Sequence, residues 1–123
     1  DATPLIREQP TTWVLYNEII DFYTNKTISP FQHGNYIPSL DMAEKLLTSN
    51  SNESCAMGLS FISDGRPSDH ALYRVDRYQC DEMIVDRVAM LAKRFGRRMQ
   101  FDAVGIGSDE SFDTLQQMVD EAE

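Results

Sequence analysis

The sequence predicts an α/β domain with a mainly parallel sheet, and three observations support this fold class. Two short apolar segments, 56–63 and 99–106, have the length and the abrupt ends that are typical of buried strands. The segment between them has strong helical periodicity, and a second helical stripe follows the later strand. This order over 57–120 predicts one parallel crossover unit. A chain of 123 residues accommodates one domain, which we assign to 1–123.

Helical spacing also predicts two helices in the first half of the chain. The first covers about 12–24, and the second, a short helix that Pro38 suits as a first-turn residue, covers 38–48. Residues 25–36 between them are rich in Asn, Thr, Ser, Pro and Gly, which predicts a loop. The apolar stripes consist of Leu15, Ile19 and Phe22 in the first helix and Leu40, Ala43 and Leu47 in the second.

A long helix is predicted between the two strands, after a polar loop over 65–79. Asp81 and Glu82 suit its start, and Gly96 is a natural C-terminal breaker. The second strand is followed by a last helix, for which Ser108 or Asp109 is the predicted cap. The stripes are Ile84, Val88, Leu91 and Phe95 in the long helix and Phe112, Leu115, Met118 and Val119 in the last one.

Two strands are too few for a stable parallel sheet, because the strands of such sheets are buried on both faces. Either the first 30 residues contain a strand that resembles a helix, or the rest of the sheet lies outside this chain. We favour the second interpretation. The same topology places Cys55 and Cys80 at opposite ends of the first strand, roughly 25 Å apart. A disulfide needs Cα atoms within about 7 Å, so we predict two free thiols.

The charge balance narrows the class of partner. Lys and Arg number 11 and Asp and Glu 20, which gives a net charge of −9. A general nucleic-acid binder or a protein that docks on anionic lipid needs a basic surface instead. No apolar run approaches the roughly 20 residues of a membrane-spanning helix. We therefore expect no nucleic-acid partner and no membrane insertion. The cysteines and two glycosylation sequons point to different compartments, so no location is predicted.

Three short segments carry candidate ligand groups. Asp64 follows the first strand directly and precedes Gly65 and a proline turn, so its carboxylate is a candidate ligand for Mg²⁺ as well as a possible turn cap. Asn35 opens the second helix and offers an amide oxygen to a metal, or a cap to the helix. The glycines of 105–107 lack the third glycine of a dinucleotide-binding turn, since position 110 is Glu. Parallel topology places the loops 64–70 and 105–109 side by side.

Taken together, these segments resemble the second half of the von Willebrand factor type A (vWA) domain family. The order and spacing match over about 33–120. The segments that carry the resemblance are Gly34-Asn35-Tyr36-Ile37, then Ile62-Ser63-Asp64-Gly65-Arg66-Pro67, then Ala103-Val104-Gly105-Ile106-Gly107. The resemblance implies a Rossmann-like three-layer α/β/α sandwich with a mainly parallel sheet and a metal-ion-dependent adhesion site at the top of the sheet.

By this resemblance, Asp64 stands at the third-loop carboxylate of the metal site and Asn35 at the position of the family's Thr. The family's Asp-x-Ser-x-Ser motif occurs nowhere in this sequence. We therefore expect a vWA-like domain fragment that lacks the first strand and its loop and holds an incomplete site for Mg²⁺, Ca²⁺ or Mn²⁺. The neighbouring residues expected to contact a partner are Arg66, Ser68 and Asp69.

The resemblance therefore implies a non-enzymatic, adhesion-type protein–protein interaction module that binds protein partners with the help of a divalent cation. The alternative is a structural or scaffold subunit of a larger assembly, in which the metal site is degenerate. A third interpretation, from another class, is a metal-dependent hydrolase that uses Asp64, Asp69 and His70. Neither histidine has a cysteine or serine partner at a recognisable spacing, so nucleophilic catalysis has no support.

Overall fold

The fold is taken from a computed structural model, in which the chain divides into two units, Ala2–Gln32 and His33–Glu123. The residues that the structure describes are 2, 6, 9–25, 34–49, 55–107 and 111–123. The candidate functional residues all belong to the second unit.

Helix α1 (Trp13–Asn25) belongs to the first unit. It begins where the Thr12 carbonyl oxygen accepts a hydrogen bond from the amide of Tyr16 at 3.1 Å, so the helix predicted over 12–24 is confirmed. At 100° per residue, its apolar side chains other than Val14 occupy one half of the circumference, while Val14, Glu18 and Asp21 lie on the other half. None of its residues is buried.

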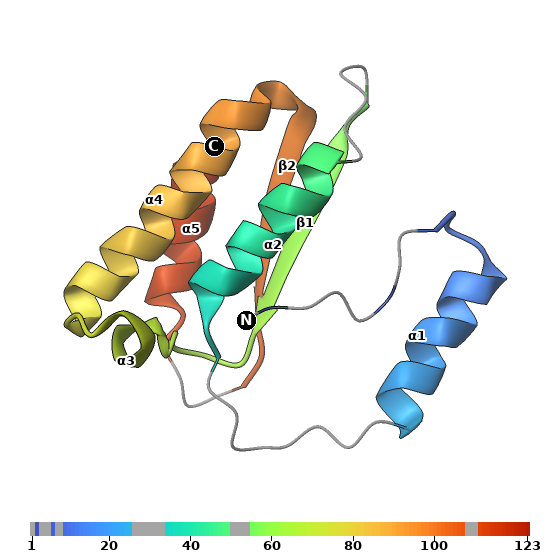
Figure 1. Cartoon of the computed structure of the whole chain (residues 1–123), viewed down its shortest axis with the longest axis horizontal. Helices are drawn as coiled ribbons and strands as arrows, with labels where there is room; N and C mark the ends of the chain where they lie inside the picture. Colours follow the sequence, from blue (N-terminus) through green and yellow to red (C-terminus); the bar gives the residue numbers. More distant parts are fainter. Residues whose placement is uncertain (1, 3–5, 7–8, 26–33, 50–54, 108–110) are drawn as a thin grey trace. The chain divides into compact units, whose positions relative to one another are not determined.

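The second unit combines helices with a two-stranded parallel sheet, which confirms the α/β class (Figure 1). Strand β1 pairs with β2 in a register that runs from Met57 beside Met99 to Ser63 beside Gly105. The predicted strands and the crossover helix between them are therefore present. The elements are α2 (Tyr36–Ser49), β1 (Met57–Ser63), α3 (Asp69–Tyr73), α4 (Arg77–Phe95), the 3₁₀ helix η1 (Gly96–Arg98), β2 (Met99–Gly105) and α5 (Asp113–Ala122).

The starts of three helices, and the presence of one additional short helix, differ from the sequence-based expectation. Helix α4 begins at Arg77, because the Asp76 side chain caps it by accepting the amide of Gln79 at 2.8 Å. The segment expected as a polar loop over 65–79 also contains the short helix α3. Helix α2 begins at Tyr36 rather than Pro38. The last helix, α5, begins at Asp113 directly after Phe112, so the prediction that Ser108 or Asp109 caps it is wrong, although these two residues themselves lie outside the described ones.

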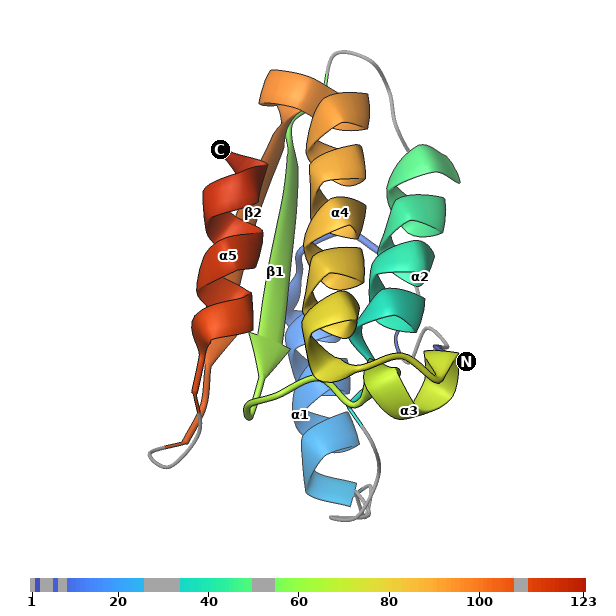
Figure 2. The same ribbon diagram turned by 90° about the vertical axis from the view of Figure 1, so that its left-hand side faces the viewer.

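The described helices of the second unit cover one face of the sheet (Figure 2). Burial alternates along both strands, and the inward residues Leu59, Phe61 and Phe101 pack on the helical core. On the opposite face, Ile62 and its neighbour Val104 are exposed. Within the described residues of this unit, the two-stranded sheet is therefore covered on one face and carries exposed side chains on the other, as expected of an incomplete sheet. This unit consists of a helical layer on a sheet.

The core lies between the helices and the covered face of the sheet. Helix α4 packs on α2 and on α5, and α5 also packs on β2. The buried apolar residues are Tyr36, Ile37, Leu40, Cys80, Ile84, Val88, Leu91, Phe95, Phe101, Leu115 and Met118. The periodic residues of the predicted long helix thus supply the centre of the core. Both cysteines are free, as predicted: Cys55 is exposed and Cys80 is buried.

In the described part of the chain, no helix has the length and apolar character that crossing a membrane requires.

Candidate functional site

The carboxyl ends of β1 and β2 bring their two loops together. The amide of Ile106 donates to the carbonyl oxygen of Ser63 at 2.9 Å, which extends the strand pairing by one step. A Cβ added to Gly107 would lie 3.9 Å from the carbonyl oxygen of Asp64, so the two loops lie side by side at this point. The predicted neighbourhood of the two loops is therefore confirmed. It follows from parallel pairing, which aligns both carboxyl ends on one edge.

A buried tyrosine connects the start of α2 to the loop that carries Asp64. The hydroxyl of Tyr36 is hydrogen-bonded to Ser63 Oγ at 2.6 Å and to the carbonyl oxygen of Gly65. Ser63 Oγ also accepts the amide of Gly65 at 3.2 Å. The ring of Tyr36 packs on Phe61, with 4.7 Å between the ring centroids. These contacts hold the residues on both sides of Asp64.

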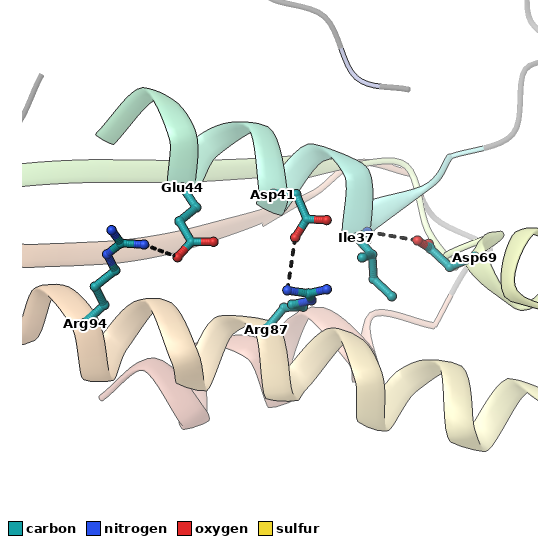
Figure 3. A network of polar contacts seen from close by, with 6 residues as sticks. All are labelled: Ile37, Asp41, Glu44, Asp69, Arg87 and Arg94. Atoms are coloured by element: carbon teal, nitrogen blue, oxygen red, sulfur yellow. Dashed lines mark hydrogen bonds and ion pairs between the residues drawn. The ribbon is translucent and has the colours of Figure 1, made fainter. Parts of the chain in front are cut away.

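A buried carboxylate connects the same loop to the backbone of α2. The two oxygens of Asp69 accept hydrogen bonds from the amides of Tyr36 at 2.7 Å and Ile37 at 2.8 Å. Figure 3 shows the bond with Ile37. The amide of Ser68 donates in turn to the carbonyl oxygen of Gly34 at 2.8 Å. Asp69 thus satisfies two of the amides that a helix start leaves unpaired, and its charge opposes the positive end of the helix dipole.

The three residues expected to contact a partner differ in their accessibility. Arg66 is exposed and Ser68 is half-buried. Asp69 has no exposed surface, since α2 covers its carboxylate. The expectation that Asp69 contacts a partner is therefore wrong: a carboxylate that is fully used inside the fold presents no surface to another protein.

The two predicted metal ligands flank the Tyr36 contacts. Asp64 is exposed and lies between Ser63 and Gly65. Asn35 directly precedes Tyr36, and its Oδ1 is buried without a hydrogen-bond partner among the described residues. A buried amide oxygen without a partner is uncommon in folded proteins and calls for an explanation. The donor type suits a hard divalent cation, which prefers oxygen ligands.

The electrostatics of this edge keep Tyr36 protonated. Burial raises the pKa of the Tyr36 phenol above its usual value of 10.0, and the nearby carboxylates of Asp64 and Asp69 add to that rise. The hydrogen bond with Ser63 lowers the pKa of the phenol, by less than burial raises it. At neutral pH the phenol is therefore a hydrogen-bond donor to the Gly65 carbonyl oxygen.

A pocket of about 280 Å³ lies beside this edge, near the starts of α4 and α5. Its lining includes Arg66, His70, Arg77, Cys80, Asp81 and Thr114.

Burial raises the pKa of the Cys80 thiol to about 11, and Asp69 and Asp81 add to this, so the thiol is neutral and unreactive at physiological pH. Thr114 Oγ1 donates to Asp81 Oδ1 at 3.1 Å, which joins α5 to α4.

The residues of the hydrolase interpretation do not assemble into a metal site. Among the described residues, which include Asp64, Asp69 and His70, no group of three or more His, Cys, Asp or Glu side chains is placed to hold a metal ion. Asp69 is already occupied by the amides of α2.

Sequence reasoning did not assign a role to Tyr36. The available signal was an aromatic hydroxyl directly after Asn35 and at the start of an apolar helical stripe. That position predicts burial, and a buried phenol requires a polar partner. Which partner it finds depends on the distant β1 loop, 27 to 29 residues away in the sequence.

Comparison with known proteins gives no relative: no family model, curated protein or solved structure matches the chain.

Proposed function

We propose that this chain is a non-enzymatic protein–protein interaction module with a vWA-like sandwich fold. It binds a carboxylate of a partner protein through a divalent cation held at the carboxyl edge of the sheet. The observation that carries the proposal is the buried, unpartnered Oδ1 of Asn35 next to the network that holds the exposed Asp64 loop. An oxygen left without a partner at this edge has the chemistry of a cation ligand.

The residues present fit part of a magnesium site. Asp64 supplies a charged oxygen and Asn35 a neutral one, whereas Mg²⁺ requires six oxygens in an octahedron. The other donors come from water, from residues beyond these two loops and from the partner's carboxylate. When bound, the cation supplies the positive charge that a carboxylate needs on this acidic protein. Arg66, which is exposed two residues after Asp64, adds a positive side chain beside the site.

The resemblance to the vWA family supports the same reading through its motifs. The Asp-Gly-x-Pro turn lies at the end of β1, and the Gly-Ile-Gly segment lies at the end of β2, so the two motifs meet at one edge. The absence of the Asp-x-Ser-x-Ser motif from the sequence limits this chain to part of the site. Completion of the sandwich by further strands is part of the proposal.

The proposal is tested by thermal unfolding with EDTA and then with increasing Mg²⁺. A ligand that binds the folded state alone stabilises it, by about 1.4 kcal/mol when its concentration is ten times Kd. We expect Mg²⁺ to raise Tm of the wild type and to have no effect on Asp64→Ala. The matched control is Asp86→Ala, which removes an exposed carboxylate from α4 and should respond like the wild type. An equal response of Asp64→Ala and wild type contradicts the proposed site.

A scaffold subunit with a degenerate metal site is the second candidate. The observation that favours it is the uncovered face of the sheet, where Ile62 and Val104 lie exposed beside each other. Parallel sheets are covered on both faces, so a neighbouring protein suits this surface. In the unfolding experiment, the scaffold function predicts that Mg²⁺ leaves Tm unchanged in the wild type and in both variants.

A further inference from the structure

Tyr36 connects the three segments around the proposed cation site. Its amide donates to Asp69 Oδ2, which belongs to α3. Its hydroxyl is bonded to Ser63 and Gly65, which enclose Asp64. Its own neighbour in the chain is Asn35. We call Tyr36, Ser63, Gly65 and Asp69 the Tyr36 network.

The geometry of the Tyr36 network fixes the two candidate ligands relative to each other. Tyr36 is 3% exposed, and its ring packs on Phe61, so the side chain has little freedom. Asn35 is fixed from the backbone side, because Asp69 holds the following amide, and Asp64 is fixed by bonds to both of its neighbours. Neither ligand residue is itself needed for these bonds.

We propose that the Tyr36 hydroxyl is the positioning group of the cation site, and the inference rests on the proposed function. Tyr36 contributes no ligand. It keeps the Asp64 turn at a set position relative to the start of α2, which Asn35 directly precedes, so these segments do not have to be ordered when the cation binds. A site that is ordered in advance binds more tightly, because the entropy of ordering is not lost on binding.

The variant Tyr36→Phe isolates this effect, since it removes the hydroxyl and keeps the ring that packs on Phe61. The probe is Mn²⁺, whose unpaired electrons broaden the NMR signals of nearby amides even when binding is weak. In the isotope-labelled wild-type chain, we expect the amides of Ile37 and Gly65 to broaden with one common midpoint. In Tyr36→Phe, we expect the midpoint to rise by about fivefold to tenfold, which corresponds to one lost hydrogen bond.

Two further variants separate positioning from general loss of structure. Tyr78→Phe, which removes a hydroxyl from a side chain that is 73% exposed, should bind Mn²⁺ like the wild type. Ser63→Ala removes the other hydroxyl of the network and should weaken binding in the same direction, which keeps the test usable if Tyr36→Phe unfolds. Amide hydrogen exchange without metal adds a second readout: Tyr36→Phe should accelerate exchange of the Gly65 amide and leave the amides in the middle of α4 unchanged.

The outcomes distinguish the inference from the function on which it rests. If Mn²⁺ broadens both loops in the wild type and Tyr36→Phe has the same midpoint, Tyr36 does not position the site, although the cation site itself stands. If Mn²⁺ broadens neither loop of the wild type, the proposed cation site is absent and the inference is overturned with it. Broadening in the wild type with a raised midpoint in Tyr36→Phe and in Ser63→Ala supports both.

Discussion

Asp69 shows how a single side chain can hold a loop to a helix. Its carboxylate has no exposed surface and accepts two amides of the first turn of α2, which lie 32 and 33 residues away in the sequence. A cap usually comes from the residue next to the helix in the chain. Here the cap comes from another element, so the α2 start and the segment after Asp64 are stabilised together.

We therefore predict that Asp69→Ala destabilises the fold by about 2 to 4 kcal/mol, because two buried amides lose their acceptor. The comparison is Asp76→Ala, which removes the local cap of α4 and should cost about 1 kcal/mol. Asp69→Asn should fall between them, since an amide oxygen can replace one of the two acceptors. The measurement is urea-induced unfolding of the three variants. A loss in Asp69→Ala no larger than that in Asp76→Ala contradicts this role.

Cys80 makes the free energy of unfolding depend on pH in the alkaline range. Burial raises the pKa of its thiol from 9.0 to about 11, and the charges of Asp69 and Asp81 act in the same direction. Between these two pH values the unfolded chain has released the thiol proton while the folded chain retains it. The folded state therefore binds more protons, and the free energy of unfolding must decrease as the pH rises from 9 to about 11.

The check is urea unfolding at several pH values, from 8 to 11, for the wild type and Cys80→Ala. Burial of the neutral thiol predicts a steeper decline in the wild type than in the variant, since the variant has no thiol to titrate at this position. Parallel declines would show that other groups account for the whole dependence. A thiol reagent at pH 8 should modify the exposed Cys55 and leave Cys80 unmodified until the chain unfolds.

At the scale of elements, one close contact sets how α5 follows β2. A Cβ added to Gly105, the last residue of β2, would lie 2.5 to 2.8 Å from ring atoms of Phe112, the residue before α5. Such distances are not tolerated between a methyl carbon and a ring. Gly105 is therefore required because the aromatic ring lies against the backbone at this point.

We predict that Gly105→Ala destabilises the fold by about 1 to 3 kcal/mol, through overpacking against the Phe112 ring. The matched control is Gly58→Ala in β1, where an added Cβ meets nothing within 4 Å. That change should be neutral or slightly stabilising, because glycine is entropically unfavourable in a strand. The measurement is Tm of both variants by thermal unfolding. Equal Tm values for the two would contradict the contact.

The helices α2 and α4 are joined by apolar packing more than by charge. Their ion pairs, Arg87 with Asp41 at 3.4 Å and Arg94 with Glu44 at 2.6 Å, are partly exposed (Figure 3). Pairs of this kind contribute about 0 to 1 kcal/mol each. The fully buried Leu40 and Val88 belong to the same two helices and to the common core. The ion pairs therefore add little to the stability of a helix contact that the apolar core already holds together.

At the scale of the whole molecule, the net charge opposes association between molecules, whereas the exposed apolar side chains favour it. The net charge is −9 at pH 7, and the calculated isoelectric point is about 4.5. The uncovered sheet face and the end of β2 carry the exposed side chains of Ile62, Val104 and Ile106. Repulsion between acidic surfaces opposes contact between these apolar side chains in different molecules, as long as the charge is large.

We predict that the chain self-associates near pH 4.5 and not at pH 7, because repulsion is smallest at the isoelectric point. Sedimentation velocity across this pH range measures the effect. The variant Ile62→Ser with Val104→Ser should associate less than the wild type at pH 4.5, because it removes apolar surface and leaves the charge unchanged. Equal association of the two proteins would mean that another surface is responsible.

The sequence by itself determined the identity and order of the main elements of this chain. Periodicity placed the core residues Ile84, Val88 and Leu91 on the buried face of α4, and the Asp-Gly turn marked the end of β1. These features are local, because a helix or a strand end depends on residues a few positions apart. Parallel pairing then placed the loops that follow β1 and β2 at one edge of the sheet.

The tertiary structure alone decided which polar groups meet at that edge. Asp69, expected on the surface, is buried under α2, and Tyr36, assigned no role, connects the start of α2 to the loop that follows β1. The uncovered face of β1 likewise became evident from its neighbours and not from its apolar composition. The physical reason is common to all three. A hydrogen bond or a covered face depends on groups that are distant in the chain, and local patterns carry no information about such pairs.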